Sequence, residues 1–206
     1  MADTARRRPG GRTARVREAV LRATVDELVS RGTADVSLDA IARRAGVNKA
    51  TLYRRWGGHA GLVLDAVEWY GVARADVPDT GSFDDDLRGW ARSIQRMLTD
   101  PAASALVRAV FTGDRVQTRP LRQRFWQSRL ELVRPLVERA IQRGEVPAGT
   151  DVDEVVRHLG APLYYRLLVL DEPVTPRSAD LAAAVTAAAA RAGAFCGPDQ
   201  SRSYSL

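Results

Sequence analysis

The 206-residue sequence lacks the features that mark several classes of protein. It holds one cysteine, Cys196, so no intrachain disulfide and no multi-cysteine metal site can form, and a reducing cytoplasm suits it. No apolar run reaches the roughly 18 residues of a membrane span. A phosphate-binding glycine loop, a His-Glu-x-x-His pair and a Gly-x-Ser-x-Gly elbow are missing. We therefore expect a cytoplasmic protein that is not an enzyme and needs no metal or cofactor.

Lysine is almost absent, because every basic residue except Lys49 is an arginine. Residues 1–60 hold 13 of the 31 basic residues and 6 of the 25 acidic ones, a net charge of +7, while the remainder nets −1. Such asymmetry predicts nucleic acid or an anionic membrane surface as partner. The arginines surround a turn motif rather than lining one amphipathic helix, which favours nucleic acid.

The hydrophobic periodicity stays near 3.6 residues, and we find no alternating strand pattern, so the fold class is all-α. Residues 1–12 are expected to form a flexible basic arm, 13–58 a DNA-binding domain, 59–76 a connecting helix, 77–197 a second domain and 198–206 a flexible tail. In the second domain we expect helices from Ser82, from Pro101 to Thr112 and from Pro120 to Arg143. Two more should run from Asp151 to Leu170, interrupted at Gly160 and Pro162, and from Pro176 to Phe195.

The strongest motif spans residues 37–56, where two short amphipathic helices capped by Ser37 and Asn48 are joined at Gly46. Leu52 and Trp56 are four residues apart and should point into the core, which leaves the polar side chains beside them facing outward. Small, hydroxyl and guanidinium side chains on one face suit phosphate and base-edge contacts in a major groove. The alternative is a helical hairpin whose polar face is only solvated, and the basic charge argues against it.

Residues 13–70 resemble the N-terminal domain of the tetracycline-repressor (TetR) family of bacterial transcription regulators. The resemblance lies in VREAVLRAT at 16–24, in SLDAIARRAGVNKATLYRRW at 37–56, and in Leu62. It implies an all-helical homodimer with an N-terminal helix-turn-helix domain that binds operator DNA. The C-terminal domain would bind a small effector and form the dimer.

The resemblance also implies DNA contacts by position, with Ser37 and Tyr53 on phosphates and Arg54 and Arg55 on base edges or backbone. The full predicted set is Ser37, Lys49, Ala50, Thr51, Tyr53, Arg54, Arg55 and His59. His59 departs from the family, which usually has a lysine there followed by an acid; a neutral histidine would donate one hydrogen bond and make binding mildly pH-sensitive. The basic arm either lies along the DNA or is an ordinary disordered tail.

Two helices of the C-terminal half carry regular apolar stripes, and residues 157–169 resemble one subgroup of TetR-family C-terminal domains. Because the family dimerises through its last two long helices, we favour these stripes as the dimer interface over burial within one protomer. The predicted interface residues are Val156, Leu159, Leu163, Leu181, Val185, Ala188, Ala192 and Phe195.

Large aromatic and aliphatic side chains on the central helices are candidates for an effector pocket, although such residues can equally form plain core. The predicted lining is Trp90, Ile94, Leu98, Phe111, Phe125, Trp126, Leu130, Tyr164 and Tyr165. It would select a largely apolar small molecule. Asp84, Asp85 and Asp86 follow the capping Ser82, so they are read as favourable charges at a helix N-terminus rather than as a metal site.

The sequence thus predicts a homodimeric, ligand-responsive DNA-binding regulator, most readily a repressor that leaves a palindromic operator when its effector binds. An activator or an effector-independent regulator on the same fold is the main alternative. An enzyme on a helical scaffold and a basic membrane-surface protein are more remote ones.

Overall fold

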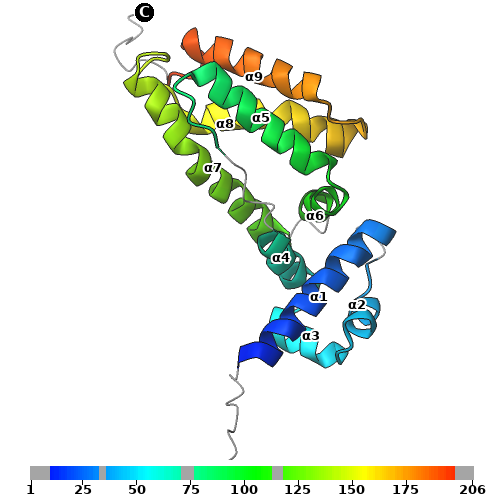
Figure 1. Cartoon of the computed structure of the whole chain (residues 1–206). Coiled ribbons are helices and arrows are strands. Elements are labelled where there is room, and N and C mark those ends of the chain that lie inside the picture. Colours follow the sequence, from blue (N-terminus) through cyan, green and yellow to red (C-terminus); the bar gives the residue numbers. More distant parts are fainter. Residues whose placement is uncertain (1–9, 33–35, 71–76, 113–117, 198–206) are drawn as a thin grey trace, which may run out of the picture. The chain divides into compact units, whose positions relative to one another are not determined.

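The computed structural model describes residues 10–32, 36–70, 77–112 and 118–197, and this part of the chain contains nine α-helices and no strand (Figure 1). The all-α prediction is therefore confirmed. Residues 1–9 of the predicted arm, 71–76 of the connecting helix and the tail 198–206 lie outside the described residues. The helices are α1 (Gly10–Arg31), α2 (Leu38–Ala45), α3 (Lys49–Trp56), α4 (His59–Tyr70), α5 (Phe83–Thr99), α6 (Pro101–Thr112), α7 (Arg119–Gln142), α8 (Val152–Tyr165) and α9 (Pro176–Arg191), with a π-helical turn, η1 (Arg166–Leu170), after α8.

Most helix starts follow the capping residues expected from the sequence. Ser37, Asn48 and Ser82 each accept a backbone N–H at the start of their helix. Thr175 does the same for α9, where Ser178 completes a capping box. Asp85 and Asp86 lie in the first turn of α5, as the electrostatic interpretation of the acidic cluster requires.

Three features of the helices differ from the prediction. Helix α1 already begins at Gly10, so residues 10–12 are helical rather than part of the arm. Helix α8 runs through Gly160 and Pro162 without interruption and continues into η1. The last helix ends at Arg191, not at Phe195, because Gly193 adopts a left-handed conformation with φ of 74°.

By their contacts the residues fall into two compact units, Met1–Gly71 with Ala105–Leu121, and Val72–Ser104 with Arg122–Leu206. The sequence had placed all of 77–197 in one domain, whereas the contacts assign 105–121 to the first unit. In the first unit α1, α2, α3 and α4 close around a core that includes Val20, Ile41, Leu52 and Leu62. Short helices bury enough apolar surface only when they share such a core.

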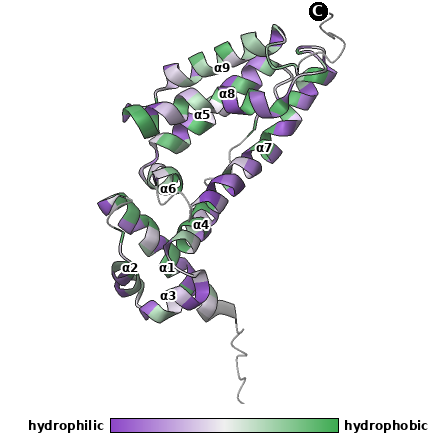
Figure 2. Ribbon diagram, turned by 180° about the vertical axis from the view of Figure 1, so that it is seen from behind, coloured by the Kyte–Doolittle hydropathy of each residue, from purple (hydrophilic) through white to green (hydrophobic). Residues whose placement is uncertain are grey.

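In the second unit α5 packs against α8 and most extensively against α9. The buried face of α9 is lined by small residues, including Ala179, Ala183 and Ala187, which allow close approach of the neighbouring helix. Trp90 and Leu87 of α5 fill the interior. Figure 2 shows hydrophobic and hydrophilic residues alternating along these helices, as expected of amphipathic elements with one buried face.

Candidate functional site

Helices α2 and α3 form a helix-turn-helix whose geometry is set by three residues. The Ser37 and Asn48 side chains accept from Asp39 N and Ala50 N at 3.2 and 2.8 Å, which caps the two helices. Gly46 between them has φ of 66°, a conformation that residues with a side chain rarely adopt. The fully buried Ile41 and Leu52 then lock the two helices into the core.

This packing turns the polar residues of α3 outward. Leu52 is buried and Trp56 is partly buried, as predicted. Tyr53 is 51% exposed, and Ala50, Arg54 and Arg55 are also exposed. Lys49 and Thr51 are partly exposed at the start of the same helix. The structure therefore brings most of the predicted DNA-contacting residues onto one surface.

Lys49 already forms an ion pair in the absence of DNA. Its ammonium donates to Asp39 Oδ2 at 2.7 Å, and this hydrogen bond raises the pKa of Lys49. Both side chains are solvent-exposed, and exposed ion pairs contribute little to stability. A phosphate can therefore replace Asp39 at small cost, so the pair is compatible with a DNA contact.

In the second unit, five of the predicted pocket residues are buried: Trp90, Ile94, Leu98, Phe125 and Tyr164. Phe125, Trp126 and Tyr164 pack edge-to-face with centroid distances of 5.2–6.1 Å. Leu130 is partly buried. Tyr165, by contrast, is 53% exposed. Phe111 belongs to the other compact unit.

Sequence reasoning missed Arg129 in this aromatic cluster. Its side chain is 3% exposed, its guanidinium lies 3.8 Å from the Phe125 ring centroid, and its Nε donates to the Tyr164 hydroxyl at 3.1 Å. A buried arginine is rare. The signal in the sequence was one arginine on the apolar stripe of α7 between Phe125 and Val133.

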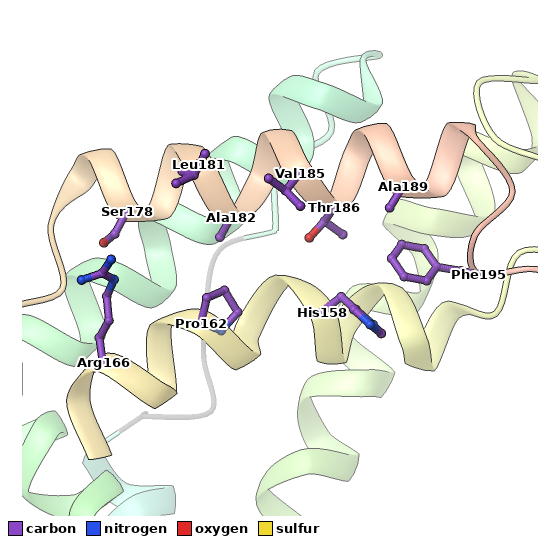
Figure 3. A pocket seen from close by; sticks show the side chains of 10 residues that line it. All are labelled: His158, Pro162, Arg166, Ser178, Leu181, Ala182, Val185, Thr186, Ala189 and Phe195. Atoms are coloured by element: carbon purple, nitrogen blue, oxygen red, sulfur yellow. The ribbon is translucent and has the colours of Figure 1, made fainter. Parts of the chain in front are cut away.

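A groove of about 250 Å³ runs between the outer faces of α8 and α9 (Figure 3). Leu181 and Val185, predicted for the dimer interface, line it and are 61% and 60% exposed. Phe195 also lines it although it is mostly buried. Ala188 of α9 and Ala192, directly after the end of α9, are exposed. His158, Pro162 and Arg166 contribute the opposite wall.

The predicted interface stripe on α8 is turned the other way. Val156, Leu159 and Leu163 are at most 1% exposed, because this stripe faces the interior of the unit. The prediction that these three residues contact a partner protomer is therefore wrong. The exposed face of α8 instead carries His158, Pro162 and Tyr165.

Two family profiles match the chain. Residues 20–66 match "Bacterial regulatory proteins, tetR family", and residues 77–192 match "Tetracyclin repressor-like, C-terminal domain". The chain belongs to the TetR family. It is accordingly a DNA-binding transcriptional regulator and not an enzyme.

Individual TetR-family proteins agree with this assignment. The HTH-type transcriptional regulator AqdR of Rhodococcus erythropolis is 38% identical over 150 residues, which make up 72% of each chain. The solved TetR family regulator SCO0332 has a TM-score of 0.64 at 29% identity, over 84% of this chain and 97% of that one. SmeT, the repressor of the Stenotrophomonas maltophilia multidrug efflux pump SmeDEF, shares the fold with a TM-score of 0.63 at 20% identity, over 84% and 89% of the two chains. SmeT has also been solved in a complex with triclosan.

In this TetR-family chain, His59 does not supply the positive charge of the lysine that the family usually has at this position. Its Nε2 is buried and finds no hydrogen-bond partner among the described residues, and burial lowers the pKa of His59. The ring is therefore neutral at pH 7. A phosphate contact through Nε2 finds no support in this geometry.

The lowered pKa of His59 predicts acid sensitivity of the fold. Below about pH 6.5 an unfolded histidine takes up a proton that the folded ring resists, so stability falls as the pH drops. We expect the melting temperature to be a few degrees lower at pH 5 than at pH 7.5, and His59→Gln to shrink that difference. His158→Gln, which removes an exposed imidazole, is the control. An unchanged pH dependence in His59→Gln would contradict the burial.

A second feature missed from the sequence is Asp65 of α4. Its carboxylate accepts hydrogen bonds from Trp56 Nε1 at 2.8 Å and from Arg17 Nε at 2.9 Å, and a second oxygen pairs with Arg17 Nη2. It thus connects α1, α3 and α4. A lone acid within the apolar run 62–67 was the available signal, because a carboxylate at the edge of a core needs partners.

Among the described residues, no helix combines the length and the apolar character that crossing a membrane requires.

Proposed function

We propose that the protein is a repressor that binds a palindromic operator as a homodimer and is released by a small, largely apolar effector. It would act on the chromosome in the bacterial cytoplasm. The observation that carries this proposal is the surface of α3, where Tyr53, Arg54 and Arg55 project from a helix held rigidly by Leu52 and by the caps of α2 and α3. A short helix with exposed hydroxyl and guanidinium groups fits the major groove.

Homodimer formation is supported by the outer face of α9. An exposed apolar stripe beside the groove shared with α8 is formed by Leu181, Val185 and Ala188 of this helix and by Ala192 directly after its end. A contiguous apolar face of this kind usually marks an interaction site. Two copies related by a two-fold axis would cover each other's stripe and would place two recognition helices on the two halves of a palindrome.

An effector site is supported by the cluster of Phe125, Trp126, Tyr164 and Arg129. Aromatic faces with one or two polar groups are typical of small-molecule sites. An effector that binds one conformer of the dimer better than the other would shift the population away from the DNA-binding form, and no chemical reaction is needed. Release of DNA by the effector defines a repressor of this kind; stronger DNA binding in its presence would instead favour the activator alternative.

Tyr53→Ala tests the recognition surface. The variant removes one phosphate contact, so we expect operator affinity to fall about tenfold, the equivalent of about 1.4 kcal/mol, while the melting temperature stays unchanged because the side chain is exposed. Tyr70→Ala, which removes a half-exposed tyrosine from α4, is the matched control. Fluorescence anisotropy with a labelled duplex from the region upstream of the gene measures the DNA affinity of both variants. Wild-type affinity in Tyr53→Ala would contradict the proposed orientation of α3.

A further inference from the structure

Helix α4 holds the end of the recognition helix α3 at two points that lie one turn apart. Gly61 approaches the backbone of Trp56 so closely that a Cβ atom at position 61 would lie 1.9 Å from the Trp56 carbonyl oxygen. Asp65, four residues later and hence on the same face of α4, accepts a hydrogen bond from the Trp56 indole at 2.8 Å. Both the backbone and the ring of Trp56 are therefore held from α4.

The Trp56 ring in turn contacts a residue of the DNA-facing surface. The Arg55 guanidinium carbon lies 5.1 Å from the centroid of this ring, within the range of a cation–π contact. Arg55 is otherwise exposed to solvent. Because the Trp56 ring is held in one orientation, the long Arg55 side chain that contacts it also has a defined position.

We propose that Asp65 is a positioning residue for DNA binding, which orients Trp56 and through it places Arg55 on a backbone phosphate. This inference rests on the proposed function, since it assumes that α3 enters the operator. Asp65 itself does not touch DNA. Its role is to fix the orientation of a ring that a rotation about χ1 or χ2 would otherwise change.

The electrostatics of Asp65 suit this role. Partial burial tends to raise the pKa of the carboxyl, but the hydrogen bonds from Arg17 and Trp56 and the charges of Arg17 and Arg55 lower it below its usual value. The group therefore stays ionised across the physiological range. A charged acceptor forms stronger and shorter hydrogen bonds than a neutral one, so the indole is held firmly. Arg17 also prevents the carboxylate from turning away, because it binds both oxygens.

Asp65→Asn tests the proposal in the full-length protein. We expect affinity for the upstream duplex to fall at least tenfold, and the dependence of log Kd on log salt to flatten by about one as the Arg55 contact is lost. The matched control is Asp26→Asn, which removes the same charge from an exposed ion pair with Arg44 in the same unit. Equal affinities of the two variants would overturn the proposal. A merely structural role would lower the melting temperature and leave the salt slope unchanged.

Trp56→Phe provides a second and milder variant. It removes the indole donor but keeps an aromatic ring, so it should weaken binding in the same direction, and adding Asp65→Asn should then cost less than it does in the wild type. Fully additive effects would contradict a shared role. This variant also assigns the Trp56 indole N–H signal in the NMR spectrum by its loss.

The indole signal tests the geometry without DNA, in case the upstream duplex is bound no better than an unrelated one. That result would show that the upstream duplex is not the operator, and it would not bear on the contacts among Asp65, Trp56 and Arg55. The Trp56 N–H resonance should move in Asp65→Asn and should titrate at acid pH together with the Asp65 carboxyl. A resonance insensitive to both changes would overturn the positioning role.

Discussion

Replacing Leu181 with arginine is expected to leave the protein folded but monomeric, and to weaken operator binding at least 100-fold. Leu181 is 61% exposed on α9, so the longer, charged side chain has room in the isolated protomer. Across a two-fold axis the same arginine would meet its own copy or the apolar wall of the groove, where an unpaired charge is costly. Val185, at 60% exposure, is expected to behave in the same way.

The loss of DNA affinity follows from the loss of the dimer. A dimer binds its second half-site as an intramolecular step, and such linkage commonly raises affinity 10²- to 10⁴-fold. Light scattering would report the mass and anisotropy would report the affinity. Gln142→Arg adds the same charge at an exposed position of α7 and should change neither. A stable dimer in both Leu181→Arg and Val185→Arg would place the interface elsewhere on the protein.

Gly61→Ala is expected to destabilise the N-terminal unit and to impair DNA binding. In an ordinary helix interior, alanine is more stable than glycine by about 0.5–1 kcal/mol. At position 61 the new methyl group would lie 1.9 Å from the carbonyl oxygen and 2.9 Å from the carbonyl carbon of Trp56. Neither group is a flexible side chain that can move aside, so α3 and α4 must separate. Overpacking of this kind costs about 1–3 kcal/mol.

The sign of the change in melting temperature distinguishes overpacking at position 61 from the usual gain of helix propensity when alanine replaces glycine. A lower melting temperature and a severalfold loss of operator affinity are expected together, because the displaced helix is the one that faces DNA. Ala60→Gly makes the reverse exchange at the neighbouring position; it should cost stability through helix propensity alone and leave affinity intact. A Gly61→Ala variant that melts higher than the wild type would show that α4 does not approach α3 this closely.

The sequence alone was sufficient to predict the helix-turn-helix, because its determinants are local. Ser37, Gly46 and Asn48 act on the residues next to them, and Leu52 and Trp56 reveal the buried face through their spacing. The fold class followed from the hydrophobic periodicity of the whole chain, and the family from the resemblance of residues 13–70 to the TetR N-terminal domain. Capping and backbone preferences act over a few residues and therefore remain readable without a structure.

Tertiary structure alone decided which faces are buried and which charges are paired. On α8 the stripe of Val156, Leu159 and Leu163 packs inside the unit, while on α9 the stripe of Leu181 and Val185 stays exposed. The two stripes have the same periodicity, so spacing could not distinguish an internal contact from an external one. Arg17 and Asp65 are 48 residues apart and meet only because α1 and α4 share a core. Such partners depend on how the helices pack, and hydrophobic periodicity specifies a helix face without specifying its neighbour.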